Sequence, residues 1–60
     1  MDKMYLTENK DIFLQKLEIG VLFVSDRYDF SEAVNREDIP FLSRGFGISV
    51  KELEDFFDSE

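Results

Sequence analysis

The sequence contains no cysteine, no histidine and no tryptophan, and it has one proline and three glycines among 60 residues. Without cysteine there are no disulfides, and without cysteine and histidine the usual structural zinc sites are excluded. The same absence removes the commonest general base and the softest nucleophile, which leaves carboxylates, lysine, tyrosine and serine for catalysis. We therefore predict a non-enzymatic protein with no metal site and no cofactor.

Long hydrophobic runs are also missing. The longest, residues 19–24, is far shorter than the roughly 20 residues that span a bilayer. The N-terminal residues lack a positive region followed by an apolar run and a small-residue cleavage site. Because the lack of cysteine also suits a reducing compartment, we expect a cytoplasmic protein with no membrane partner.

Acidic side chains are what the sequence has in excess. Fourteen carboxylates face seven lysines and arginines, for a net charge of −7. Residues 25–60 hold ten of the acidic side chains and four of the basic ones. A surface of this sign repels phosphates and membrane headgroups and attracts basic partners.

Apolar residues are plentiful enough for one core. Hydrophobic residues make up 43% of the chain, and seven phenylalanines and two tyrosines are its largest apolar side chains. A chain of this length buries only about 60% of the surface that its unfolded form exposes. We expect residues 1–60 to form a single small domain, stabilised by an efficient core, by self-association or by a partner.

The first half of the chain is predicted to be helical. Thr7 is a suitable N-cap, and Phe13, Leu17, Val21 and Val24 recur at helical spacing behind it. Gly20 weakens this prediction, because glycine destabilises a helix interior by about 1 kcal/mol relative to alanine. The alternative is a buried strand at residues 20–24, paired with residues 4–6 or with the same strand of a second molecule.

Two short helices are predicted next. Asp29 followed by Glu32 resembles a capping box, which predicts a helix over residues 30–35. Asp38 is a candidate N-cap for the following helix, with Pro40 tolerated in its first turn. That helix is expected to end at Arg44, with a left-handed glycine at position 45 as its C-cap.

The last helix has the clearest start. Ser49 and Glu52 have capping-box spacing, which places the helix start after Ser49. Asp55 and Asp58 lie near its C-terminal end, where the helix dipole is negative, so its last turn should fray unless a basic partner covers it. The fold class expected is all-α, a small bundle of three to four short helices with a helix-turn-helix-like C-terminal corner. The alternative is α+β with a short strand at residues 20–24.

Residues 39–56 carry a spaced pattern of small, glycine and apolar positions. The pattern consists of Ser43, Gly47 and the apolar residues Leu42, Phe46, Ile48, Leu53 and Phe56. It resembles the helix-turn-helix of the phage repressor and Cro type, which implies a DNA-binding regulator acting as a homodimer. In that resemblance the groove-facing positions are Ser49, Val50, Lys51, Glu54 and Asp55. One base against two acids is a poor match for a phosphate backbone, so the charge argues against nucleic acid.

The composition favours a small acidic protein that binds another protein with a basic surface and modulates or inhibits it. A nucleic-acid-binding protein is a natural target class, because acidic side chains can occupy a site shaped for phosphates, and such an inhibitor would suit a phage or mobile element. The candidate partner-binding residues are Glu52, Glu54, Asp55, Phe56, Asp58, Asp26 and Asp29. Two alternatives stay open at this point: a helix-turn-helix transcriptional regulator acting as a homodimer, and a structural subunit of an oligomer.

Overall fold

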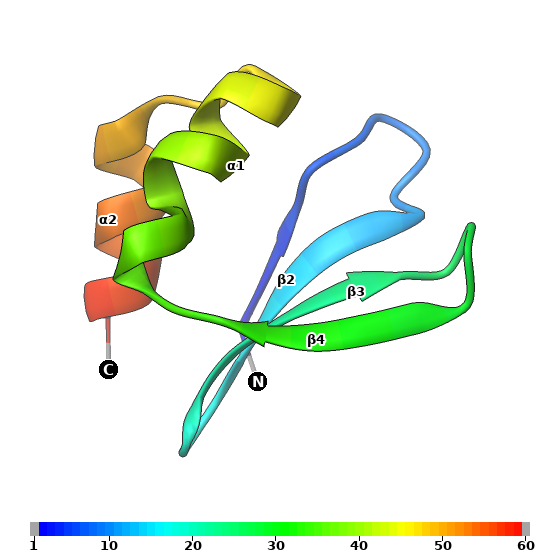
Figure 1. Ribbon diagram of the computed structural model, residues 1–60, viewed down its shortest axis with the longest axis horizontal. Coiled ribbons are helices and arrows are strands. Elements are labelled where there is room, and N and C mark those ends of the chain that lie inside the picture. Colours follow the sequence, from blue (N-terminus) through cyan, green and yellow to red (C-terminus); the bar gives the residue numbers. More distant parts are fainter. Residues whose placement is uncertain (1, 60) are drawn as a thin grey trace.

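Four β-strands precede two α-helices along residues 2–59, the part of the chain that the computed structural model describes. The strands are β1 (Lys3–Tyr5), β2 (Ile12–Leu17), β3 (Gly20–Ser25) and β4 (Phe30–Val34). A short 3-10 helix, η1 (Arg36–Asp38), leads into α1 (Ile39–Phe46), and α2 (Val50–Asp58) follows. Figure 1 shows the two helices side by side against the twisted sheet. Within the described residues, no helix is long and apolar enough to cross a bilayer.

The sheet is an antiparallel meander in which each strand pairs with the next one along the chain. Leu17 pairs with Gly20 across a tight turn between β2 and β3, and Gly20 has a φ of 151° that other residues rarely adopt. Asp29, in the turn between β3 and β4, has a φ of 53°, in a region that aspartate tolerates better than most residues. These connections fix which side chains share a face of the sheet.

The predicted all-α bundle is wrong, because the fold is α+β. The helix expected from Thr7 onward is instead β2, a turn and β3. Strand β2 is apolar on both faces: Ile12 and Leu14 are buried under the helices, while Phe13 points to the opposite face and is still only 8% exposed. A strand of this kind does not show the alternation of apolar and polar residues that distinguishes a strand from a helix.

The strand considered as the alternative for residues 20–24 is present as β3, with different partners from those expected. It pairs with β2 on one side and with β4 on the other. The segment around Met4 pairs with β2 rather than with β3, and Met4 lies opposite Leu14.

The helix predicted over residues 30–35 is also wrong, because these residues form β4 and its exit. The capping box occurs one segment later. The Asn35 side-chain oxygen accepts a hydrogen bond from the Glu37 N–H at 2.9 Å, and the Asp38 carboxylate accepts one from the Asn35 N–H at 3.0 Å. Asp38 therefore serves η1, and its side chain makes no capping bond to α1.

The end of α1 and the start of α2 can be compared with their predicted positions. Helix α1 continues through Gly45 to Phe46, and Gly47 is its left-handed C-cap, with a φ of 69° and an N–H that donates to the Ser43 carbonyl at 2.9 Å. The predicted C-cap at Gly45 is wrong. The predicted start of α2 is confirmed, since the Ser49 hydroxyl accepts a hydrogen bond from the Glu52 N–H at 3.1 Å.

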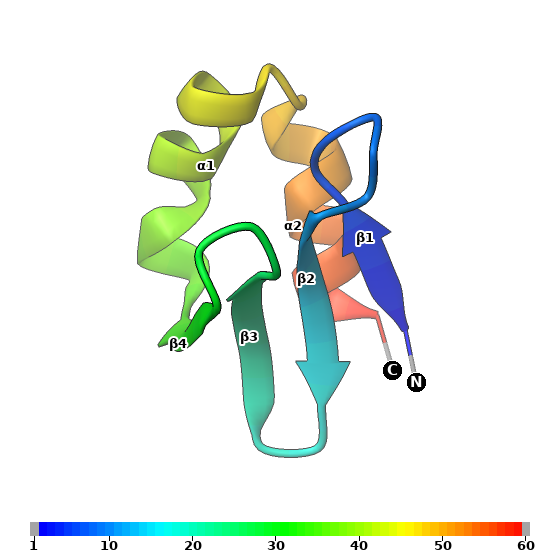
Figure 2. The ribbon, with the colours of Figure 1, turned by 90° about the vertical axis from the view of Figure 1, so that its right-hand side faces the viewer.

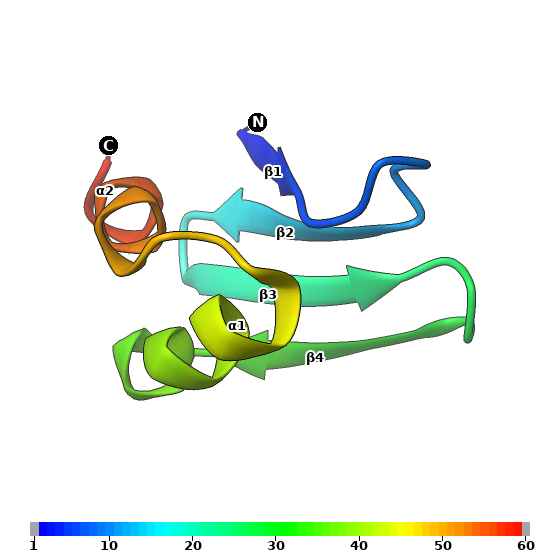
Figure 3. The same cartoon turned by 90° about the horizontal axis from the view of Figure 1, so that it is seen from above.

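The helix-turn-helix assignment fails at the level of the whole fold. Two helices do meet through the turn at Gly47, but both pack on a four-stranded sheet instead of within a helical bundle. Figures 2 and 3 show α1 on the β3–β4 side of the sheet and α2 on the β1–β2 side. The two helices thus cover one face of a sheet, and the resemblance to repressors does not imply a sheet.

The core lies between the helices and one face of the sheet. Leu14 from β2 and Leu53 from α2 are completely buried at its centre. The remaining members of the buried cluster are Leu6, Ile12, Val21, Ile39 and Leu42. On the opposite face of the sheet, the Tyr5 and Phe13 rings meet edge to face at 5.7 Å and the Lys3 ammonium lies 4.7 Å from the Phe13 ring centre.

A lysine from the sheet closes the C-terminal end of α2. The Lys16 ammonium donates to the carbonyl oxygens of Phe56 at 3.0 Å and Phe57 at 2.5 Å, and it also bonds the Ser59 carbonyl. The last carbonyls of a helix have no partners within it and carry partial negative charge. The basic cover that the sequence led us to expect from a partner is therefore supplied by Lys16 of β2, in the same chain.

Candidate functional site

A groove of about 420 Å³ lies between α1 and the β3–β4 half of the sheet. We call it the aromatic groove. Its apolar lining consists of Phe23, Phe30, Val34, Phe41, Leu42 and Phe46. Its polar lining is Glu32, Asp38 and Arg44, with Gly45 completing the wall.

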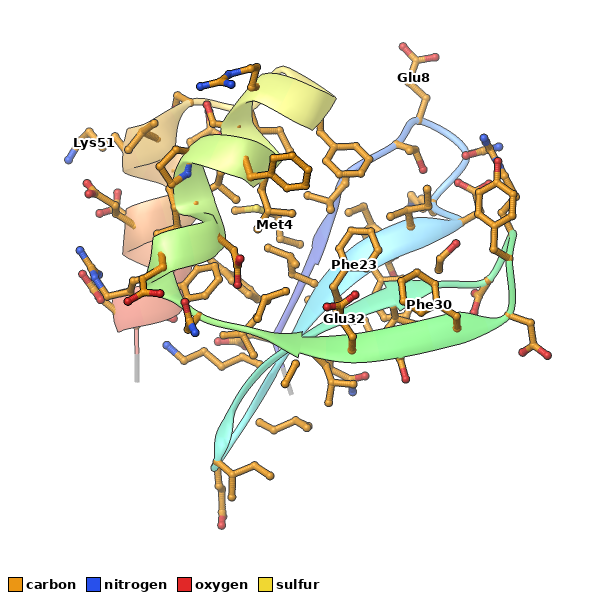
Figure 4. The ribbon with its side chains drawn as sticks, in the orientation of Figure 1. Met4, Glu8, Phe23, Phe30, Glu32 and Lys51 are labelled. Atoms are coloured by element: carbon orange, nitrogen blue, oxygen red, sulfur yellow. The ribbon has the colours of Figure 1, made fainter. Side chains whose placement is uncertain are left out.

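Strand pairing places the floor of the groove. Phe23 in β3 pairs with Glu32 in β4, so both side chains project from the sheet on the side of the helices. Phe30 lies two residues before Glu32 on the same face, and its ring centre is 5.9 Å from that of Phe23. Figure 4 shows Phe23, Phe30 and Glu32 as neighbours in front of the sheet. The floor is therefore aromatic with one carboxylate beside it.

Helix α1 supplies the opposite wall. The Phe46 ring centre lies 6.0 Å from that of Phe23, so this contact joins α1 to the sheet. Ile39 and Leu42 turn inward and are buried, while Phe41 between them points outward and is 78% exposed. A phenylalanine this exposed at the edge of an apolar groove adds to the surface that a partner can cover.

The charges around the groove are unequal. Glu32 and Asp38 contribute two carboxylates, and Arg44 contributes one guanidinium. The Asp38 carboxylate is held in place by the Asn35 N–H. The groove thus combines an apolar interior with a predominantly acidic margin.

Comparisons with protein-family models, with curated proteins and with solved structures found no match for this chain. The residues that line the groove indicate what it can bind. Aromatic rings offer area and shape to an apolar side chain, and the carboxylates offer hydrogen-bond acceptors and charge to a cationic one. This combination is suited to binding an amphipathic or basic segment.

The candidate residues predicted on α2 lie outside the aromatic groove. Figure 4 shows Lys51 projecting from the far side of the helices, away from Phe23 and Phe30. Asp55 lies 3.9 Å from Lys51, and Arg36 pairs with both Glu54 and Asp58. Glu52 is exposed beside them. The carboxylates at 52, 54, 55 and 58 form an acidic helix side that is partly neutralised within the chain.

Phe56 is half-buried and packs against the core, with its ring edge to face with Phe57 at 6.4 Å. Asp26 and Asp29 lie in the β3–β4 turn, at the end of the sheet opposite α2 in Figure 1. The predicted residues are thus divided between two separate places. Their role in binding stays a prediction.

A second polar cluster has a structural role. The Thr7 hydroxyl donates to one Asp11 carboxylate oxygen at 2.6 Å, and Arg27 Nε donates to the other at 2.7 Å. The Thr7 hydrogen bond, followed by the Arg27 guanidinium, holds the pKa of Asp11 below its ordinary value. The Asp26 N–H also donates to the Asp11 carbonyl at 2.7 Å. The cluster ties the β1–β2 connection to the β3–β4 turn.

Sequence reasoning missed the groove because it placed residues 30–35 in a helix. In a strand, Phe30, Glu32 and Val34 share one face, whereas in a helix they do not. A signal was present: the polar stretch 26–29 separates two segments rich in β-branched and aromatic residues, a pattern typical of a hairpin. With that pairing, residues 23 and 32 would have been placed side by side.

Proposed function

We propose that this protein is a small acidic, non-enzymatic module that acts in the cytoplasm by binding another protein and thereby modulating or inhibiting it. The aromatic groove is its main contact surface. The observation that carries the proposal is the groove itself, an apolar surface with an acidic margin and an exposed Phe41. Aromatic side chains in desolvated pockets supply a large share of binding energy at protein interfaces.

Charge supports a basic partner. The chain carries −7 overall, and Glu32 and Asp38 outnumber Arg44 at the groove. Carboxylates that line the groove favour a ligand with lysine or arginine next to an apolar anchor, because opposite charges that meet in the contact fix the orientation of the ligand. A phosphate backbone would meet repulsion at the same surface. We therefore favour a protein ligand over a nucleic acid.

The proposal is tested by selection from a displayed library of random peptide segments, with the immobilised protein as target. We expect the selected segments to be enriched in basic and large apolar residues. Binding of a selected segment should weaken about tenfold or more in Phe41→Ala, since a tenfold change corresponds to about 1.4 kcal/mol, within the range of a single interface anchor. Phe41 is exposed, so this substitution removes contact area without opening the core.

Ile19→Ala is the matched control. Ile19 is 95% exposed in the β2–β3 turn and does not line the groove, so its truncation removes a comparable apolar side chain from another surface. Equal losses in Phe41→Ala and Ile19→Ala would show that apolar exposure alone drives capture. A library that yields no segment dependent on Phe41 would overturn the proposed function.

A further inference from the structure

Strand β4 forms an outer margin of the sheet. It pairs with β3 on one side only, and the sheet order ends with it. Figure 3, which views the molecule from above, shows β4 as the outermost strand of the sheet, with the start of α1 beside its C-terminal end. An edge strand of this kind carries unpaired N–H and C=O groups that can pair with an added chain.

The register identifies which backbone groups face outward. Leu17 and Gly20 close the tight β2–β3 turn, so they exchange hydrogen bonds, and β3 residues at even positions bond β2. The hydrogen bond from the Asp26 N–H to the Asp11 carbonyl continues this alternation, because residue 26 is also even-numbered. Odd-numbered β3 residues therefore bond β4, through residues 30, 32 and 34. The N–H and C=O groups of Ser31 and Ala33 are left pointing away from the sheet.

We propose that a partner binds by adding an extended segment to β4 as a further strand, paired through the backbones of Ser31 and Ala33. This inference rests on the proposed function and specifies how the aromatic groove is occupied. The residue of the added strand opposite Glu32 has its side chain on the helix-facing side, beside the groove. That position takes lysine or arginine, and the positions two residues away on the same face take large apolar side chains that enter the groove.

The other face of the added strand meets little obstruction. Ser31 and Ala33 are small and exposed, and their side chains point away from the helices. The backbone hydrogen bonds then provide affinity, and the groove provides selectivity for side chains. The same two contributions are found when peptides bind other proteins by extending a sheet.

Charge argues for a basic segment and against a second copy of this chain. Antiparallel self-pairing centred between the outward-facing residues would place Glu32 directly opposite Glu32 of the other copy, and like charges opposite one another destabilise a strand pair. Each copy would also bring a net charge of −7. A charged residue at the middle of an edge strand is a known way of preventing self-association.

The probe is a short synthetic peptide in which threonines alternate with leucine, arginine and phenylalanine, titrated by fluorescence anisotropy against a scrambled isomer. A set of analogues carries one backbone N-methyl group each, which removes a donor and blocks strand pairing at that residue. We expect N-methylation at alternate peptide positions to lower the affinity for the protein about tenfold or more. N-methylation at the positions between them should lower it by less than about twofold. That alternation identifies strand pairing, since side-chain contacts alone do not depend on backbone donors in this way.

On the protein, Ala33→Pro removes one outward N–H without removing a bond to β3, because proline is tolerated on the free side of an edge strand. Ala33→Val keeps the donor and serves as its control. We expect the proline variant to lose peptide binding and the valine variant to retain it, with circular dichroism checking the fold of both. The N-methyl series decides the matter even where the proline variant is destabilised.

The outcomes separate this inference from the function on which it rests. Binding that depends on Phe41 but lacks the alternation would overturn strand addition and leave the groove as the contact surface. Failure of the alternating peptide to bind at millimolar concentration, while library segments still bind through Phe41, would overturn the predicted pattern of side chains. Absence of both kinds of binding would overturn the inference and the proposed function together.

Discussion

Gly45 and Gly47 lie two positions apart at the end of α1 and differ in backbone conformation. Gly45 is helical, and a Cβ added to it would meet nothing within 4 Å. Gly47 has a φ of 69°, a conformation that costs other residues about 1–2 kcal/mol. We expect Gly45→Ala to raise the free energy of unfolding by about 0.5–1 kcal/mol and Gly47→Ala to lower it by about 1 kcal/mol. Urea unfolding followed by circular dichroism measures both.

The two substitutions control for each other, since each adds one methyl group at the same end of the same helix. Opposite signs place the helix end after Phe46. If Gly45→Ala were the more destabilising, the helix would end at Arg44, as the sequence alone suggested.

These residues also show what local sequence can predict. The Ser49 cap was predictable because its hydrogen bond to Glu52 closes within one turn and depends on nothing distant. The choice between Gly45 and Gly47 was not, since either glycine satisfies the local rule. The helix end at Gly47 keeps Phe46 in α1, where its ring contacts Phe23. Phe23 lies in a strand that was predicted from the sequence to be part of a helix, so this contact could not be foreseen.

At the scale of an element, the C-terminal end of α2 is stabilised by Lys16 of β2. We expect Lys16→Met to lower the free energy of unfolding by about 1–2 kcal/mol, because it keeps most of the apolar stem and removes the donor to three carbonyls. Lys51→Met is the matched control: Lys51 is highly exposed, lies in the first turn of α2 and has one distant carboxylate at 3.9 Å. Its expected effect is below about 0.5 kcal/mol.

Chemical denaturation measures both lysine variants, and amide hydrogen exchange in residues 54–58 shows where the effect is located. Faster exchange confined to the last turn in Lys16→Met is the expected pattern. Equal loss of stability in the two variants would contradict a specific role for Lys16.

The elements that the sequence predicted wrongly share a physical cause. Residues 12–14 and 21–24 carry apolar side chains on both faces of the sheet, so neither helical nor strand periodicity is distinctive there. Long-range pairing then decides, and pairing is not encoded in a single segment. Helix α2 was predictable because it has a local cap and one apolar face. The aromatic groove was not, because it is formed by β3, β4, η1 and α1, which meet only in the folded chain.

At the scale of the whole molecule, the excess of acidic charge affects encounter and bound contact differently. Charges at the periphery of an interface mainly change the association rate and its salt dependence, while charges within the contact change dissociation. Asp55 on α2 lies outside the aromatic groove, and Glu32 lines it. The two residues therefore distinguish steering from contact.

We expect Asp55→Lys to slow association of a selected peptide severalfold and to leave its dissociation rate unchanged, with the difference disappearing in high salt. Glu32→Gln should instead speed dissociation and have a smaller effect on association. Stopped-flow or surface-based kinetics at two salt concentrations measure both rates. If Asp55→Lys sped dissociation more than Glu32→Gln, the partner would contact α2, the surface that the sequence alone favoured, and the groove would be peripheral to it.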